Sequence, residues 1–383
     1  MDEDENAEWK HGKWRRIGKD MLIFTPDNIE HREKIAGADL DGTLIATKSG
    51  KTFPQNEFDW KLSYPVIPQI LEQYHSDGFK VVVFTNQKGI QVSFSKLFYT
   101  SLFSWKVPVA VFISLGTVMY RKPCTGMWDY LESTENGDIK IDRSQSVYVG
   151  DAAGRVATKV DKKKDFSAAD RLFALNLGVP FFTPEQFFLK KQIEEHYILP
   201  AFNPAVFMET KKERFEPGRV YSSEVIVFVG LPGCGKTKLA NELAEKHDYA
   251  TVNRDSMKTW QKCVEATKVY LKRGKSVIVD NTNCDMISRK RYIDLSKSFG
   301  VDCRCFYFVC DIAQAVHNCK FRILVGTDRV HEEVGIMVLR TMKSKSQEPS
   351  LEEGFSSIVK VNFVPSFDSD AHRNLYSLYL SDT

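Results

Sequence analysis

Residues Glu224–Thr237 read EVIVFVGLPGCGKT, and this stretch decides the fold of the second half of the chain. The segment before the first glycine is an apolar run of the kind found in a fully buried parallel strand. The remainder fits the pattern G-x-x-x-x-G-K-[ST], and helical spacing follows over residues 237–247. A strand, a glycine-rich loop and a helix in this order predict an α/β domain with a parallel sheet.

The glycine-rich loop predicts a site for a nucleotide triphosphate. Glycines let backbone amides close around phosphate oxygens, and the N-terminus of the following helix adds partial positive charge. We expect Lys236 to reach the β- and γ-phosphates of ATP and Thr237 to bind Mg²⁺. The predicted nucleotide-binding residues are Gly230, Gly233, Cys234, Gly235, Lys236 and Thr237.

The segments after this loop indicate how an acceptor could be bound. Val252–Asp255 reads VNRD after a short apolar run. A carboxylate here can accept a proton from an acceptor hydroxyl, so Asp255 is a candidate general base; the alternative is a helix N-cap. Arg254 is a candidate contact for an acceptor phosphate, or else an ordinary ion-pair residue. The stretch 317–329 predicts either a lid over ATP or a solvated helix face, with the basic residues Lys320, Arg322 and Arg329.

The first half of the chain carries polar motifs directly after strand-like runs. Asp39–Thr43 reads DLDGT, Phe84–Asn86 reads FTN and Val149–Asp151 reads VGD, while Arg121–Pro123 (RKP) lies between the last two. Ligands bind beyond the carboxyl ends of the strands in parallel sheets. The motifs therefore predict one common site in a second α/β domain.

The residue types in these motifs suit phosphate removal. We expect Asp39 to attack phosphorus and form an aspartyl-phosphate, and Asp41 to protonate the leaving alkoxide and then activate water. Asp39, Asp41 and Asp151 supply the oxygen ligands that suit Mg²⁺. Thr85 and Lys122 would stabilise charge on the transferring phosphoryl group. DLDGT alone could be an Asx turn that closes a strand, but the four motifs in this order resemble the layout of haloacid-dehalogenase-type phosphatases.

Length and composition set the expected organisation. A chain of 383 residues is long enough for two domains, and its net charge of +3 is not that of a polycation. The eight cysteines are scattered without C-x-x-C spacing, which favours a reducing compartment. No apolar run approaches the roughly 20 residues needed to span a bilayer. We expect a tail with a short strand over 1–34, the phosphatase-type domain over 35–200, a linker over 201–223 and the P-loop domain over 224–383.

Longer sequence segments extend these motifs in both halves of the chain. They are Asp39–Ile45, Phe84–Gln87, Arg121–Asp129, Val149–Arg155, Lys162–Ala174, Val252–Asp255 and Val279–Asn283. With these segments in this order, the chain resembles the polynucleotide kinase 3'-phosphatases, a family of end-healing enzymes of DNA repair, from about Met21 to near the C-terminus.

The resemblance implies a haloacid-dehalogenase-like 3'-phosphatase domain followed by a P-loop 5'-kinase domain that uses ATP and Mg²⁺. It implies that nucleic-acid ends are the substrates, DNA first and RNA as the alternative, and that the protein is nuclear; we expect a monomer. By position, Phe53 and Arg121 match residues that contact DNA, Asp255 matches the kinase base and Arg254 its acceptor-side arginine.

Three features depart from the family pattern. Val92 stands where the family has an arginine that touches the DNA backbone, and Lys320 where we expect a lid arginine. Only about twenty residues precede the matching region, so we expect any repair-scaffold protein to be bound without a forkhead-associated domain.

Other functions remain open at this stage. They are an RNA end-healing enzyme, a small-metabolite kinase and phosphatase, and a binding scaffold whose phosphatase half has decayed, as Val92 would suggest. Activity on 3'-phosphorylated DNA, RNA and mononucleotides, compared side by side, separates them.

Overall fold

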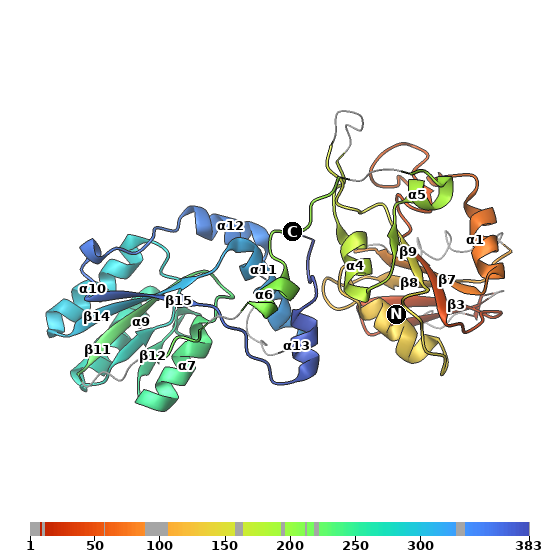
Figure 1. The fold of residues 1–383 in the computed structure, drawn as a ribbon. Coiled ribbons are helices and arrows are strands. Elements are labelled where there is room, and N and C mark those ends of the chain that lie inside the picture. The colour runs from red at the N-terminus through yellow and green to blue at the C-terminus, as the bar shows by residue number, and fades with distance from the viewer. Residues whose placement is uncertain are drawn as a thin grey trace. The chain divides into compact units, whose positions relative to one another are not determined.

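The computed structural model describes residues 8–9, 12–56, 58–88, 106–157, 164–192, 196–210, 213–217, 222–326 and 334–382. Val92, Lys162 and Arg329, which the sequence singles out, lie outside these residues. The chain divides into a first unit, Met1–Ala201 together with Leu378–Thr383, and a second unit, Phe202–Ser377. Each unit contains its own sheet with helices around it (Figure 1).

The first unit is built on an eight-stranded sheet in the order β1-β2-β3-β8-β7-β4-β9-β10. The strands from β8 to β10 run parallel, whereas β1, β2 and β3 form antiparallel pairs at one edge. Their bounds are β1 Glu8–Trp9, β2 Gly12–Ile17, β3 Met21–Pro26, β4 Lys34–Ala38, β7 Phe79–Asn86, β8 Val109–Ser114, β9 Val147–Val149 and β10 Phe181–Phe182. A separate hairpin pairs β5 Ile45–Ala46 with β6 Lys61–Leu62.

Alternation along β7 explains why helices lie on both faces of this sheet. Val81 and Val83 pack in one core cluster with α1 (Ile67–Ser76) and α5 (Pro184–Leu189). Val82 and Phe84 point to the other face, toward α3 (Gly126–Tyr130) and α4 (Ala169–Leu177). A short π-helix, Leu131–Glu135, continues α3. Because both faces are covered, β7 is apolar almost throughout, as expected of a central parallel strand.

The N-terminal region contributes more strands than the expected tail with one short strand. Residues 12–26 form two paired strands, and β3 pairs in turn with β8, so this hairpin belongs to the sheet. Trp14 and Phe24 are buried against each other with ring centroids 5.1 Å apart. Burial of these large side chains stabilises β2 and β3. The pattern of residues within each segment alone did not predict that the two strands pair. The last residues, Leu378–Thr383, also belong to the first unit and not to the P-loop domain.

The second unit is built on a five-stranded parallel sheet in the order β12-β13-β11-β14-β15. The strands are β11 Glu224–Val229, β12 Ala250–Val252, β13 Val277–Val279, β14 Asp302–Val309 and β15 Ser357–Asn362. Ile226 and Phe228 face α7 (Lys236–His247), α11 (Ile312–Leu324) and α12 (Ile336–Ser344). Val225, Val227 and Val229 face α9 (Trp260–Lys272) and α10 (Met286–Phe299).

Short elements complete the second unit. They are α6 Pro204–Glu209, α8 Arg254–Met257, the 3-10 helix Leu351–Glu353 and α13 Asp370–Tyr376. Helix α6 lies within the expected linker, where the Asn203 side chain caps it by accepting a hydrogen bond from the Val206 amide. Among the residues that the structure describes, no helix has the length and apolar character needed to cross a membrane.

In both sheets the order in which strands are added reverses at the strand that precedes a phosphate-handling motif. Strand β4 lies between β7 and β9, and β11 lies between β13 and β14. In each sheet the strands that come next in sequence lie on one side of this strand, and later strands lie on its other side. Such a switch point opens a crevice at the carboxyl ends of the strands, which is where α/β proteins bind ligands. Both units have the α/β architecture that the sequence predicts.

Two candidate active sites

The first site lies at the carboxyl edge of the parallel strands in the first unit. Asp39 and Asp41 follow β4, Thr85 is near the end of β7, and Asp151 follows β9. Neighbouring strands therefore bring these side chains to one edge, as the motif order predicts. Lys122 comes from the loop between β8 and α3.

Lys122 is the most extensively bonded of these residues. Its Nζ atom donates hydrogen bonds to the carboxylates of Asp39 at 2.6 Å and Asp170 at 2.7 Å. The same atom donates to the Phe84 carbonyl at 2.7 Å and the Tyr148 hydroxyl at 2.9 Å. The side chain is buried, so this ammonium group is a fixed positive charge beside the Asp39 carboxylate.

Asp170, the second residue of α4, joins this site although the sequence did not single it out. One carboxylate oxygen from each of Asp39, Asp151 and Asp170 lies within 4.8 Å of the others, a spacing that could hold a metal ion. Asp41 is not in this group; its carboxylate accepts a hydrogen bond from the Gln87 side chain. The amide of Gln87 also donates to the Thr85 hydroxyl at 3.0 Å, so it orients both side chains.

Gly42 lets the Asp39–Thr43 turn approach Asp151 closely. Its φ is +80°, and a Cβ atom added there would lie 2.3 Å from an Asp151 carboxylate oxygen. No other residue fits that space in that backbone conformation. The Thr43 hydroxyl accepts a hydrogen bond from the Asp151 amide at 2.9 Å, which ties the two loops together.

The electrostatics of the site favour a bound cation. Burial raises the pKa of the Asp39 carboxyl well above its usual value, although Lys122 acts in the opposite direction. Burial and the neighbouring Asp170 raise the pKa of Asp151 to about 7. Three carboxylates face one ammonium group, so the ionised site carries excess negative charge that a divalent cation would balance.

Asp41 has the character of a proton donor. Loss of hydration raises the pKa of its carboxyl, even though part of the residue still reaches solvent, while the hydrogen bond from Gln87 lowers it. A carboxyl group at the mouth of the site with a raised pKa suits general acid catalysis.

The two residues expected to contact nucleic acid lie on two different loops of the first unit. Phe53 is 77% exposed in the loop between β5 and β6, a hairpin that starts directly after DLDGT. Asp59 holds this loop by accepting hydrogen bonds from the Ser49 and Gln55 amides. Arg121 precedes Lys122, and its Nη1 atom is buried without a hydrogen-bond partner among the residues that the structure describes.

The second site is the loop between β11 and α7. The Lys236 Nζ atom donates to the carbonyls of Gly230 at 3.0 Å and Leu231 at 2.7 Å, so the side chain folds back over the loop. The Asn318 side chain donates from Nδ2 to the Gly233 carbonyl at 2.8 Å, and its Oδ1 atom accepts from the Tyr376 hydroxyl at 2.6 Å. These bonds hold the loop in the conformation that leaves its glycines at positive φ.

Asp280 gives this site a buried carboxylate that the sequence did not assign a role. It follows β13, and its Oδ2 atom accepts hydrogen bonds from the Thr237 hydroxyl at 2.7 Å and from the side-chain Nδ2 of Asn253 at 3.1 Å. Its Oδ1 atom is buried with no hydrogen-bond partner in the described part of the chain. A buried oxygen of this kind beside a hydroxyl ligand fits a Mg²⁺ site.

The candidate acceptor residues lie on α8. Asn253 caps this helix by accepting a hydrogen bond from the Asp255 amide at 2.7 Å, so the cap is Asn253 and not Asp255. The Arg254 amide donates to the Asn281 side chain at 2.7 Å. Arg254 and Asp255 are both exposed, next to the strand ends that carry Asp280.

Comparisons with known proteins agree with this two-site arrangement. Residues 34–188 match the family model for "Polynucleotide kinase 3 phosphatase", and residues 225–349 match that for "AAA domain". A bifunctional polynucleotide phosphatase/kinase of Schizosaccharomyces pombe is 33% identical over 359 residues, which cover 91% of this chain and 84% of the relative. The chain belongs to the bifunctional polynucleotide phosphatase/kinase family.

Two further relatives fit this assignment. A protein of Acanthamoeba polyphaga mimivirus, named as a putative bifunctional polynucleotide phosphatase/kinase, is 30% identical and covers 89% of this chain and 87% of its own length. The polynucleotide 3'-phosphatase ZDP of Arabidopsis thaliana is 37% identical over 197 residues, 46% of this chain and 27% of the plant protein.

The residues that sequence reasoning missed in this family member fall into two kinds. Asp280 directly follows a strand, so the same strand-end rule that singled out Asp39 could have found it. Asp170 and Tyr148 come from the start of a helix and from within a strand, and no local pattern marks them as partners of Lys122. Of the residues proposed for a lid, Lys320 and Arg322 lie on α11.

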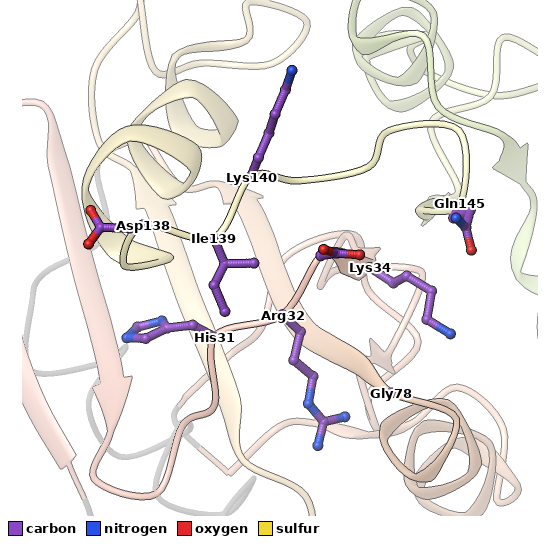
Figure 2. Close-up of a pocket in the computed structure, with 9 residues that line it drawn as sticks. His31, Arg32, Lys34, Gly78, Asp138, Ile139, Lys140 and Gln145 are labelled. Carbon is purple, nitrogen blue, oxygen red and sulfur yellow. The ribbon is translucent and has the colours of Figure 1, made fainter.

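One further cavity, of about 640 Å³, lies in the first unit (Figure 2). Its lining includes Arg32, Lys34 and Gly78, which precede or begin β4 and β7. It is therefore at the amino ends of these strands, the edge opposite to Asp39. The Arg32 guanidinium donates to the Phe79 carbonyl at 3.0 Å and pairs with Glu30, so its charge is already engaged.

Proposed function

We propose that this chain removes 3'-phosphates from DNA ends at the site around Asp39 and phosphorylates 5'-hydroxyl ends with ATP at the Gly230–Thr237 loop. The observation that carries the proposal is that each unit has a set of phosphate-handling side chains at the carboxyl edge of its own parallel sheet. Membership of the bifunctional polynucleotide phosphatase/kinase family supports both activities. The two reactions leave a 5'-phosphate and a 3'-hydroxyl, the termini that ligation requires.

In the phosphatase reaction, the Asp39 carboxylate attacks the 3'-phosphate phosphorus, and the bond from phosphorus to the 3'-oxygen breaks. Asp41 gives its proton to the leaving 3'-oxygen, which its raised pKa favours. Asp41 then takes a proton from the water that hydrolyses the aspartyl-phosphate, releasing inorganic phosphate and restoring Asp39. Lys122 and Thr85 stabilise the charge on the phosphoryl oxygens.

The residues present fit Mg²⁺ in both units. Asp39 and Asp151 would hold it in the first unit, with Asp41 and Asp170 at its side, and Thr237 and Asp280 would hold it in the second. When bound, Mg²⁺ offsets negative charge on the phosphate groups.

In the kinase reaction, Asp255 takes the proton of the 5'-hydroxyl as the 5'-oxygen attacks the γ-phosphate of ATP, and ADP leaves. Lys236 would exchange its bonds to the Gly230 and Leu231 carbonyls for bonds to phosphate oxygens. Arg254 would bind a phosphate of the acceptor strand. Gly233, Cys234 and Gly235 would offer backbone amides to the nucleotide phosphates.

The finer points of the proposal concern substrate and setting. Phe53 would stack on a base of the strand that enters the phosphatase site, and Arg121 would contact its phosphates. The protein would act as a monomer. DNA ends as substrates support a nuclear location. A repair-scaffold protein would be a compatible binding partner there.

A gapped duplex with a 5'-hydroxyl and a 3'-phosphate, incubated with ATP and Mg²⁺, tests the proposal in one tube. We expect conversion of both termini, loss of only the phosphatase in Asp39→Asn, and loss of only the kinase in Lys236→Ala. If wild-type protein leaves both termini unaltered, the proposal is wrong. If either single substitution removes both activities, the sites are not independent; a preference for mononucleotides or RNA would favour the alternative substrates.

A further inference from the structure

The chain segment Leu378–Asp382, here called the C-terminal segment, lies on the first unit although the residues before it belong to the second. Leu380 is only 2% exposed, so the segment is packed into the unit and not merely laid over it. Its hydrogen bonds reach Asn176 on α4, Ser167 just before α4, and Cys124 on the loop that carries Lys122.

Asn176, near the end of α4, makes the central contact. Its side-chain carbonyl accepts a hydrogen bond from the Tyr379 amide at 2.8 Å, and its amide donates to the Tyr379 carbonyl at 2.8 Å. The same amide group donates to the Pro123 carbonyl at 2.9 Å. One side chain thus joins the C-terminal segment to the residue that follows Lys122.

Two further contacts fix both sides of this arrangement. The Cys124 thiol donates to the Leu380 carbonyl, with sulfur and oxygen 3.7 Å apart. At the other end of α4, the Ser167 hydroxyl donates to Asp382 and accepts from the Ala169 amide, at the first residue of the helix. The C-terminal segment therefore contacts α4 near its end, through Asn176, and contacts Ser167, which lies just before the helix begins.

The elements that it contacts are those that place Lys122. Asp170 on α4 accepts a hydrogen bond from the Lys122 ammonium, and its other oxygen accepts from the Ala152 amide, next to Asp151. On the opposite side, the Asn86 side chain holds the Lys122 backbone through bonds of 2.9 Å to its amide and 3.2 Å to its carbonyl. Asn86 and Asn176 together fix the loop, because Asn86 bonds to the backbone of Lys122 and Asn176 bonds to the carbonyl of Pro123.

We infer that the C-terminal segment is a positioning element of the phosphatase site: through Asn176 and α4 it sets where Lys122 and Asp170 stand relative to Asp39. The inference rests on the proposed 3'-phosphatase function and extends it. A part of the chain that follows the kinase domain in sequence then determines the rate of the other reaction. Displacement of a catalytic group by about 1 Å can cost on the order of a hundredfold in rate, so loss of these contacts need not unfold the unit to be visible.

The test uses the full chain with Asn176→Leu, which keeps the side-chain size and removes all three hydrogen bonds, and with Leu380→Ala. We expect kcat for release of phosphate from a 3'-phosphate oligonucleotide to fall roughly tenfold or more in each, with KM little changed. Kinase activity in the same sample should stay at the wild-type level. The matched control is Leu175→Ala on α4, because the Leu175 side chain is 50% exposed. Leu380→Met should keep the wild-type rate that Leu380→Ala loses, because methionine fills the same space.

Each outcome has a defined consequence. Wild-type phosphatase rates in both Asn176→Leu and Leu380→Ala would overturn the inference. A loss that disappears when the assay is cooled, or that reduces kinase and phosphatase activity equally, would show a role in folding only and would also overturn it. Wild-type protein without phosphatase activity in the parallel reaction would instead overturn the proposed function.

Discussion

Replacing Lys122 with methionine should destabilise the first unit as well as abolish phosphate release. Lys122 contacts two carboxylates, Asp39 and Asp170, at 2.6 and 2.7 Å, and all three side chains are nearly inaccessible to solvent. Methionine fills a similar volume but leaves these carboxylates without their counter-charge. Removing one partner from a buried ion pair costs about 3–5 kcal/mol, a large share of the stability of an ordinary domain.

The pH dependence of this loss follows from the sign of the charge. Without Lys122, burial and mutual repulsion would hold the folded-state pKa of these carboxyls above the unfolded value of about 4. Folding of the variant then favours the protonated forms, so the penalty should shrink as the pH is lowered toward that value. Mg²⁺ should also restore part of the lost stability, because it replaces the missing positive charge.

Urea unfolding monitored by tryptophan fluorescence measures the effect, since Trp260 is the only one of the six tryptophans in the second unit. Adding Asp170→Asn to Lys122→Met removes one of the unpaired charges and should recover about 2 kcal/mol or more without recovering activity. A loss below about 1 kcal/mol in the single variant would refute the reasoning, as would a double variant no more stable than the single one.

Three further predictions address other parts of the chain. Asp280→Asn should lower kinase activity at least tenfold and raise the Mg²⁺ concentration needed for half-maximal kinase activity, because the Asp280 carboxylate contacts Thr237. Phosphatase activity in the same sample is the control, and an unchanged Mg²⁺ titration of the kinase would contradict the assignment. Phe53→Ala should weaken oligonucleotide binding at the phosphatase site by about 1–3 kcal/mol, seen as a raised KM for an oligonucleotide but not for a small aryl phosphate. Burial lowers the pKa of His317 to about 4, so the folded protein takes up a proton less readily than the unfolded chain and stability should fall below pH 6.5, by about 2 kcal/mol at pH 5. The free energy of unfolding of His317→Gln, compared with wild type at pH 7 and pH 5, should lack this part of the acid dependence; equal acid slopes would contradict it.

Local motifs accounted for most of the fold and for the centre of each site. The buried strand before Gly230 and the loop after it are continuous in sequence, so backbone geometry alone places Lys236 and Thr237. The same holds for DLDGT after β4. For residues 1–34 we expected a tail with one short strand. The strand is present as β3, but its pairing with β2 and β8, which accompanies the burial of Trp14 and Phe24, was not predicted.

The sequence by itself determined which groups can do phosphate chemistry, because a strand that ends in a polar motif delivers those side chains to a sheet edge whatever the rest of the chain does. The tertiary structure alone decided their partners. Asp170 reaches Lys122 from the start of a helix, Asp280 reaches Thr237 from a neighbouring strand, and Tyr379 reaches Asn176 from beyond the second domain. Such pairs depend on strand order and helix packing, and neither is written in the spacing between the residues that meet.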